Sequence, residues 1–406
     1  MVFPLLLALA VPADLVPARW TWSDTQSLEL LKETPINCLL VNFDPARGES
    51  WAAFSVKARQ SGVETLAVLT PGPDIVKVAT QAAAAKFAGI VLEGDFAEGA
   101  AEQVRQATKA LVIEMTPRYK MNLSGGVALL ATYQAVWPGI QIQEEGAAKA
   151  APSGGPWIDT NSGFLRAARA WGPSTLWLGN RPPAKAVVKG ERYLQVLSDA
   201  AMVGARWVLA LDDEFAASLR KGDAKAVETW KRISQYLRFF EEHKAWRSFT
   251  AEGQLAIVQD AEAGALLSGG IVDMITVKHT PVRPVPRSRL SDEALRGVTM
   301  AVNVDAEGMS DSQRNALRSF TRGGGTLLTA PPGWKSTAPH APDRITLEKD
   351  EVERLDRIWK EVNSMIGRRN LGARLFNVSS MLSNLQAAPD GKQLFVHLVN
   401  YSDYPV

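Results

Sequence analysis

The sequence predicts an α/β protein whose larger part is a (β/α)8 barrel, followed by a smaller flavodoxin-like domain and a short C-terminal β segment. Between residues 36 and 245, short apolar runs rich in β-branched residues alternate with helical stretches. This alternation is typical of parallel strands buried on both faces. The chain has 406 residues, which is too long for one ordinary domain. Seven or eight strand–helix units in about 210 residues fit a closed barrel.

The predicted barrel strands follow one another along the chain. They are INCLLVNF (36–43), VETLAVLT (63–70), FAGIVLEG (87–94), ALVIEMT (110–116), GVALLATY (126–133), STLWLGN (174–180) and ARWVLALDD (205–213), with GPWID (155–159) as a weaker eighth. A long amphipathic helix over 224–249 closes this region. A doubly wound open sheet is the alternative, but no Gly-x-Gly-x-x-Gly follows the first run.

A second α/β unit follows the barrel. Its predicted strands are GQLAIVQD (253–260), a segment around GGIVDMITV (269–277), GVTMAVNVD (297–305) and GTLLTAPP (325–332). The Pro- and Arg-rich stretch 279–290 between two of them is predicted to be a loop. The run Gly323–Gly325 follows a helix over 310–322 and precedes a strand. A phosphate-binding loop has the reverse order, so these glycines are interpreted as a helix stop.

The C-terminal 60 residues change character. An amphipathic helix over 350–367 precedes two strands in 379–402, which a Pro-Asp-Gly turn joins. Two strands are rarely stable alone, so they either pack on the preceding domain or begin a β-sandwich. The predicted divisions are 1–20 as a leader, 21–250 as the barrel, 251–345 as the flavodoxin-like domain and 346–406 as the helix with β-strands.

Composition excludes several function classes. The 45 Lys and Arg residues nearly balance the 43 Asp and Glu residues, which gives no electrostatic case for binding nucleic acid. The single cysteine, Cys38, lies in an apolar run and is expected in the core, so no intrachain disulfide can form. No segment after the N-terminus is long and apolar enough for a membrane span. The apolar start Phe3–Val11 and the small residues after it resemble a secretory leader, which favours a secreted or periplasmic protein over a cytoplasmic one.

Polar and aromatic side chains gather where the predicted barrel strands end, which is where barrel enzymes carry their reactive groups. The candidate catalytic residues are Glu114, Asp159, Asp212 and Asp213. The candidate substrate-binding residues are Asn42, Asp44, Glu93, Arg118, Tyr133, Trp137, Asn161, Asn180 and Arg181. Carboxylates, amides and rings together suit a sugar, and glycoside hydrolysis needs two carboxyl groups. The carboxylates at helix starts have a second interpretation as helix caps, and Trp137 has one as a core residue.

The sequence predicts no metal and no cofactor. The four histidines are scattered along the chain, and none of them lies at the end of a predicted barrel strand. This argues against a His-rich metal site. A Gly-x-Ser-x-Gly nucleophile turn is also missing from the sequence.

The order of barrel, long helix, flavodoxin-like domain and β-strands resembles the family 42 β-galactosidases and related barrel glycoside hydrolases. LRSFTRGGGTLLTAPPGW (317–334) looks like part of their amidotransferase-like domain, while PWIDTNSGFLRAARAW (156–171) and LFVHLVNYS (394–402) are similar to pieces of secreted bacterial proteins of this build. The resemblance implies a carbohydrate substrate and a homo-oligomer formed through the second domain. The only cysteine is at position 38, so it does not imply glutaminase chemistry.

The same family carries an Asn-Glu acid/base pair after its fourth strand and a nucleophilic Glu after its seventh. Here the fourth predicted strand has Ile113 before Glu114, and STLWLGN and the residues after it supply no carboxylate. The sequence therefore leaves three hypotheses. They are a divergent glycoside hydrolase, a catalytically inert barrel that binds carbohydrate or serves as a scaffold, and an α/β enzyme for a phosphorylated small molecule. The third lacks the glycine-rich turn before a helix that phosphate binding requires.

Overall fold

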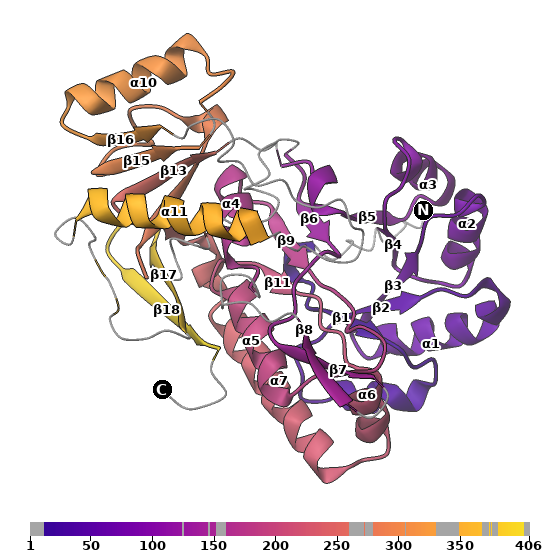
Figure 1. Cartoon of the computed structure of the whole chain (residues 1–406). Helices are drawn as coiled ribbons and strands as arrows, with labels where there is room; N and C mark the ends of the chain where they lie inside the picture. The colour runs from indigo at the N-terminus through magenta and orange to yellow at the C-terminus, as the bar shows by residue number, and fades with distance from the viewer. Residues whose placement is uncertain are drawn as a thin grey trace.

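The computed structural model describes most of the chain. It covers residues 12–123, 126–144, 147–151, 160–259, 279–304, 306–329, 349–367 and 381–401, together with Val272, Ala373 and Leu375. Figure 1 shows a large N-terminal body and, beside it, a smaller layered body that holds α10 and α11. Within these ranges, no helix has the length and apolar character that crossing a membrane requires.

Eight parallel strands form one sheet in the order β1-β2-β3-β4-β5-β6-β9-β11. They are β1 (Pro17–Trp20), β2 (Cys38–Asn42), β3 (Glu64–Leu69), β4 (Gly89–Glu93), β5 (Leu111–Thr116), β6 (Leu129–Thr132), β9 (Thr175–Leu178) and β11 (Arg206–Trp207). The last strand returns to the first, because the Arg19 N–H donates to the Leu209 carbonyl at 2.7 Å and the Leu209 N–H donates to the Pro17 carbonyl at 3.2 Å. The fold is thus the predicted (β/α)8 barrel.

The start of the barrel differs from the sequence prediction. Strand β1 lies inside the stretch 1–20, which is predicted as a leader, and the predicted first strand is in fact the second. The sequence does not predict β1, because its four residues PARW include a proline and an arginine and contain no β-branched run. Strands β2–β6 therefore each move up by one in the count, while β9 remains the seventh barrel strand. The predicted weak strand at 155–159 lies outside the described residues.

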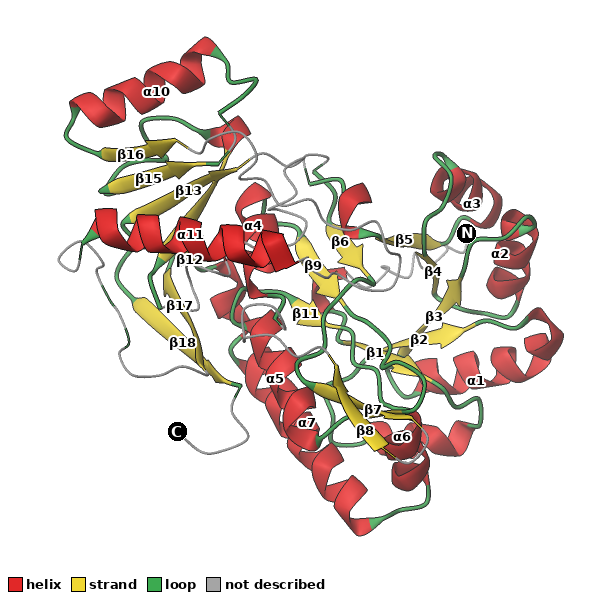
Figure 2. Cartoon of the chain, viewed as in Figure 1, coloured by secondary structure: helices red, strands yellow, loops and turns green. Residues whose placement is uncertain are grey.

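Helices cover the outside of the barrel, as Figure 2 shows. They are α1 (Gly48–Gln60), α2 (Ile75–Ala84), α3 (Ala100–Thr108), α4 (Ser162–Trp171), α5 (Gly190–Ala201), α6 (Asp213–Arg220) and α7 (Ala224–Glu242). One apolar cluster fills the barrel and includes Cys38, Leu66, Val91, Met115 and Trp177. Cys38 is fully buried, as predicted, and burial raises the pKa of its thiol.

A small antiparallel sheet is inserted beside the barrel and is absent from the sequence prediction. It has the order β10-β7-β8 and consists of β7 (Ile140–Glu144), β8 (Ala147–Ala151) and β10 (Ala186–Val187). The insertion joins the loop after β6 to the loop after β9. Both of these loops follow carboxyl ends of barrel strands, so the small sheet borders the mouth of the barrel.

The second domain is a four-stranded parallel sheet in the order β14-β13-β15-β16. Its elements are β13 (Leu255–Gln259), β14 (Val282–Pro286), β15 (Met300–Asn303), α10 (Asp311–Arg322), β16 (Thr326–Thr329) and α11 (Lys349–Ile366). Helix α10 packs on one face through Ala316 and Leu317, and α11 packs on the other through Ile358 and Val362. Helix α11 thus packs on the flavodoxin-like sheet, although the predicted boundary at 345 separates it from that domain.

Two local predictions in this domain have different outcomes. The glycine run is a helix stop, because Gly323 caps α10 and Gly324 has a φ of +95° before β16 begins. The stretch 279–290 is not only a loop, because it contains β14. Strand β14 lies at the sheet edge, where Pro284 and Pro286 are tolerated although a proline cannot donate to a ladder. The predicted strand around 269–277 lies outside the described residues, except for Val272.

The C-terminal strands form the predicted hairpin and pack on the barrel. Strands β17 (Met381–Ala387) and β18 (Leu394–Asn400) pair antiparallel, and β17 also pairs with β12 (Thr250–Ala251), which follows α7. The buried Leu382 and Val399 belong to the same apolar cluster as the barrel helices. The Gln195 amide of α5 also donates to the Asn400 carbonyl at 2.9 Å. The hairpin therefore packs into the apolar layer shared with the barrel helices and is not a free module.

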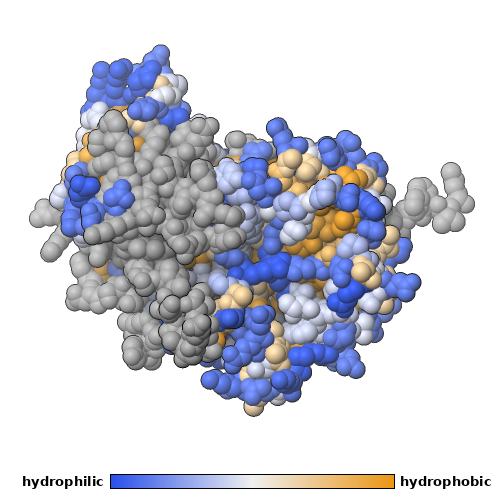
Figure 3. All heavy atoms as spheres, turned by 45° about the vertical axis from the view of Figure 1, so that its right-hand side comes forward, coloured by the Kyte–Doolittle hydropathy of each residue, from blue (hydrophilic) through white to orange (hydrophobic). Residues whose placement is uncertain are grey.

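The surface mixes polar and apolar side chains. Figure 3 brings the side of α1–α3 forward and shows hydrophilic atoms spread over the face with an apolar area among them. A folded protein commonly leaves much apolar surface exposed in this way.

We expect Leu382→Ala to destabilise the whole barrel. The side chain is fully buried in the shared core, and removing it leaves a cavity that costs about 2–5 kcal/mol. Chemical denaturation followed by tryptophan fluorescence measures the effect. Leu394→Ser on the exposed face of β18 is the matched control and should change stability by no more than about 0.5 kcal/mol. Equal stability losses for both variants would contradict this packing.

Candidate functional site

Four side chains from different strands meet at the mouth of the barrel. Glu93, the last residue of β4, forms ion pairs through Oε2 with Arg19 of β1 and through Oε1 with Arg181 after β9, the latter at 3.5 Å. Arg181 also donates to Asn42 Oδ1 at the end of β2. The Arg19 and Glu93 side chains are only 7% and 13% exposed, so water screens this pair poorly. We call these four residues the mouth cluster.

Two cavities open beside the mouth cluster. The larger has a volume of about 540 Å³ and is lined by Glu93, Tyr133, Asn180 and Arg181 among others. The smaller measures about 160 Å³, and its lining residues include Trp22, Asn42, Arg181 and Asp213. Both cavities share Arg19 and Arg181, so the two arginines stand between them. A ligand at the mouth would meet this pair of guanidinium groups from either side.

With β1 as the first strand, Glu93 rather than Glu114 lies at the strand position where the family described above has its acid/base. Glu93 ends the fourth barrel strand, whereas Glu114 lies on the fifth. Leu92 precedes Glu93, so the Asn-Glu pair is still incomplete. The seventh strand is β9, and the residues after it are Gly179, Asn180 and Arg181. An arginine therefore follows the strand after which the family places its nucleophilic carboxylate.

Glu114 is not at the mouth. Its neighbours Ile113 and Met115 point into the barrel, so the alternation of the strand turns Glu114 outward. There it accepts a hydrogen bond at 2.9 Å from Arg105 of α3. The sequence prediction placed Glu114 at a strand end, but the strand continues to Thr116. The half-exposed pair is an ordinary surface ion pair.

Two of the other predicted carboxylates cap helices. Asp212 is the N-cap of α6, and its two oxygens accept from the Phe215 N–H at 2.9 Å and the Tyr193 hydroxyl at 2.7 Å. Asp44 accepts from the Ala46 N–H at 2.9 Å and caps a short 3-10 helix. The capping interpretation thus accounts for both. Asp213 is exposed and lines the smaller cavity, and Asp159 lies outside the described residues.

Three predicted binding residues are structural instead. The Trp137 ring is buried, contacts Trp207 with 5.0 Å between centroids, and donates its N–H to the Asn180 carbonyl at 3.1 Å. The guanidinium of Arg118 donates to the Gln134 carbonyl and, at 3.0 Å, to Asn161 Oδ1. Arg118 and Asn161 are only 3% and 1% exposed, so a sugar at the mouth could not reach them.

The remaining predicted residues do converge. Asn42, Glu93 and Arg181 belong to the mouth cluster, while Tyr133 and Asn180 line the larger cavity. The sequence prediction missed two neighbours, Arg19 and Trp22. Arg19 lies on the unpredicted β1, and Trp22 follows it, half-buried, with its ring 4.7 Å from that of Trp20. A tryptophan two residues beyond a strand end is a recognisable signal only once that strand is known.

A buried carboxylate supports this region from behind the mouth. Asp199 of α5 accepts the Asn161 N–H at 2.8 Å, and Asn161 in turn binds Arg118. Burial is the main cause that raises the pKa of Asp199 from 3.8 to about 6, although the hydrogen bonds from Asn161 oppose it. Ionisation of the buried Asp199 therefore lowers the stability of the folded protein at neutral pH.

The mouth cluster can bind polar groups, but it lacks a free acid. Both oxygens of Glu93 are engaged by guanidinium groups, and both oxygens of Asp212 accept hydrogen bonds. Within the described ranges no three His, Cys, Asp or Glu side chains gather as metal ligands would. The guanidinium, amide and ring groups that face the cavities are those that bind sugar hydroxyls and sugar faces.

Comparison with known proteins gives one kind of match. No protein-family model and no curated protein matches the sequence. Among solved structures, the chain is similar to a cold-adapted β-galactosidase from Rahnella sp. R3, with 9% identity and a TM-score of 0.55. The match covers 96% of this chain and 93% of that one. At this identity the likeness shows a shared fold and nothing more specific.

We expect Arg19→Met to destabilise the protein by on the order of 3 kcal/mol, because it leaves a nearly buried Glu93 carboxylate short of a partner. The double variant Arg19→Met/Glu93→Gln should recover most of that loss. Urea denaturation of the wild type, both single variants and the double variant gives the coupling free energy. Additive effects would mean that the two side chains do not interact.

We expect Asp199→Asn to stabilise the protein at pH 7 by up to about 3 kcal/mol. The neutral amide replaces an ionised carboxylate that burial disfavours in the folded protein. The folded protein holds the Asp199 proton up to about pH 6, while the unfolded chain releases it near 3.8. Wild-type stability should therefore fall, relative to the variant, as the pH rises from 4 to 6. Thermal unfolding across this range measures the difference, with the exposed Asp292→Asn as the matched control. A difference that stays constant with pH would refute the assignment.

Proposed function

We propose that the barrel mouth binds carbohydrate and does not cleave it. The observation that carries this proposal is the pairing of Glu93, whose two oxygens are held by Arg19 and Arg181. A general acid needs a carboxyl oxygen that is free to carry and deliver a proton. The barrel fold shared with a glycoside hydrolase supports carbohydrate as the ligand, and the occupied carboxylate favours binding without hydrolysis.

The lining of the two cavities suits a sugar. Asn42, Asn180 and Arg181 offer amide and guanidinium groups to hydroxyls. Trp22 in the smaller cavity and Tyr133 in the larger one offer ring faces for a pyranose. A saccharide of two or more units could contact both rings, because the cavities lie on the two sides of the same arginine pair. Four predicted binding residues thus keep a role in this proposal.

Hydrolysis is the second candidate function, and one specific observation favours it. Glu93 ends the fourth barrel strand, where the resemblance described above puts an acid/base, and Asp213 lines the neighbouring cavity as a second carboxylate. Substrate binding would then have to draw Arg19 or Arg181 away from Glu93. Of the four predicted catalytic residues, only Asp213 serves this candidate within the described ranges.

Two wider features belong to the proposal. The apolar run Phe3–Val11 supports export from the cytoplasm, and cleavage after Ala13 would leave β1 in the mature chain. The flavodoxin-like domain supports a homo-oligomer, as the family resemblance implies. Size-exclusion chromatography with light scattering tests the second point.

Binding and cleavage are separated by measuring both on the same sugars. We expect the wild type to bind β-linked galacto-oligosaccharides in calorimetry while reducing ends stay at background. Trp22→Ala and Arg181→Ala should weaken binding about tenfold or more, since each removes a direct contact. The exposed Tyr236→Ala on α7, which lines neither cavity, is the matched control.

Two outcomes would overturn this function. Release of reducing sugar that Glu93→Gln abolishes would replace binding with hydrolysis. If a panel of neutral and acidic oligosaccharides gives no heat of binding, the carbohydrate proposal itself is lost.

A further inference from the structure

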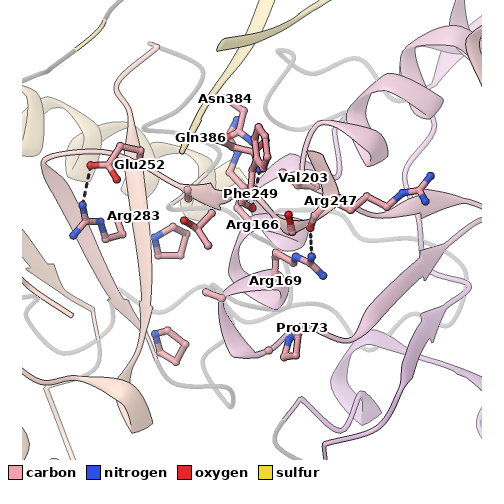
Figure 4. A pocket seen from close by; sticks show the side chains of 18 of the residues that line it. Arg166, Arg169, Pro173, Val203, Arg247, Phe249, Glu252, Arg283, Asn384 and Gln386 are labelled. Carbon is pink, nitrogen blue, oxygen red and sulfur yellow. Dashed lines mark hydrogen bonds and ion pairs between the residues drawn. The ribbon is translucent and has the colours of Figure 1, made fainter. Parts of the chain in front are cut away.

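A third cavity, larger than the two at the mouth, lies at the opposite end of the barrel. It has a volume of about 1090 Å³ and touches Thr175 and Arg206, which begin β9 and β11, and Asp14, which lies in the segment before β1. Its far wall comes from the second domain, including β14, and from the hairpin strand β17. Figure 4 shows side chains from all three parts around one space. We call it the interdomain cavity.

The lining of the interdomain cavity is strongly cationic. Among the described residues it has eight Arg and Lys side chains but only three Asp and Glu side chains. This contrasts with the whole chain, in which the two kinds nearly balance. The cations come from both sides, with Arg169, Arg206 and Arg247 on the barrel side and Arg283 and Arg289 on the other. An excess of this size within one cavity attracts anions.

Several of these arginines contact neutral carbonyls rather than carboxylates. Arg169 donates to the Ser174 carbonyl at 3.0 Å and to the Arg247 carbonyl, and Arg289 donates to the Ala170 carbonyl at 3.1 Å and to the Trp171 carbonyl. In the part of the chain that the structure describes, neither has a carboxylate within ion-pair distance. These contacts hold each guanidinium in place but leave its charge uncompensated.

Two further arginines of the cavity share one carboxylate partner. Arg206 and Arg247 both form ion pairs with Glu241, and the charge of Asp14 also acts on Arg247. Burial lowers the pKa of the Arg247 guanidinium, and the neighbouring charge of Arg206 lowers it further. Burial also lowers the pKa of the Arg169 guanidinium. The negative charge of a bound anion would favour the charged form of both guanidinium groups.

We propose that the interdomain cavity binds a small molecule carrying several oxyanion groups, such as phosphates or carboxylates. The planar fork of arginine pairs with both groups through two parallel hydrogen bonds. A ligand there would contact the barrel and the second domain at once and would stabilise their relative position. This site is separate from the mouth, so the inference stands whether or not the mouth binds sugar.

Calorimetry at constant ionic strength tests the proposal on the full chain, because salt alone screens surface charge. The probes are tripolyphosphate and citrate, with the neutral trisaccharide maltotriose as the uncharged reference. We expect at least one anionic probe to bind with a stoichiometry of one and a Kd below about 1 mM. Tighter binding of tripolyphosphate points to a phosphorylated ligand, and tighter binding of citrate points to a polycarboxylate.

The test variant is Lys244→Glu/Arg296→Glu. Both side chains line the cavity and are exposed, and among the described residues the only ion pair lost is the surface contact between Arg296 and Glu293. Folding should therefore be retained, while anion binding weakens about tenfold or more. The matched control Lys57→Glu/Lys77→Glu makes the same charge change on α1 and α2 and should bind within about twofold of the wild type.

The proposal is overturned if neither anion gives more heat than sodium chloride at the same ionic strength. It is also overturned if Lys244→Glu/Arg296→Glu binds as tightly as the wild type. Arg169→Met changes a side chain inside the cavity and should also weaken anion binding. Thermal unfolding of each variant tests whether it is folded.

Discussion

The carboxylate of Glu93, held between two guanidinium groups, ties together three strands that are far apart in the sequence. Arg19 comes from the first barrel strand, Glu93 from the fourth and Arg181 from the loop after the seventh. A charge in the interior is tolerated only when it is paired, so the nearly buried Arg19 and Glu93 depend on each other, while Arg181 is partly exposed. The mouth of the barrel takes its shape from this constraint, since both cavities lie against the same two arginines.

The same constraint decides which chemistry the mouth can support. Glycoside hydrolysis needs one carboxyl group that is protonated and one that is ionised. In this barrel, the carboxylate after the fourth strand is paired, and an arginine follows the seventh strand. Arg181, which follows the seventh strand, also forms an ion pair with Glu93, which ends the fourth strand. Among the described residues, the amide, guanidinium and ring groups at the mouth suit a sugar, and the paired Glu93 favours the proposed binding without cleavage.

The fold was largely predictable because burial on both faces gives barrel strands continuous apolar runs. Seven of the barrel strands follow this rule, and PARW in β1 does not. Strand β14 escapes prediction for a related reason, since its prolines are acceptable only at a sheet edge, and sequence does not reveal which strand is the edge. The site was less predictable, because it depends on the strand count and on which face each residue takes. Without β1, the strand count assigns Glu114 instead of Glu93 to the fourth strand. The alternation within β5 turns the Glu114 side chain away from the barrel interior.

The two ends of the barrel use arginine in opposite ways. At the mouth, Arg19 and Arg181 meet a carboxylate, so their charges are compensated within the protein. At the other end, Arg169 and Arg289 meet backbone carbonyls, which fix the orientation of a guanidinium without cancelling its charge. Positions fixed in this way are preorganised, so an anion that binds there loses little affinity to the ordering of side chains. With charge neutralised at the mouth and concentrated beneath the second domain, the two proposed binding surfaces differ in chemistry.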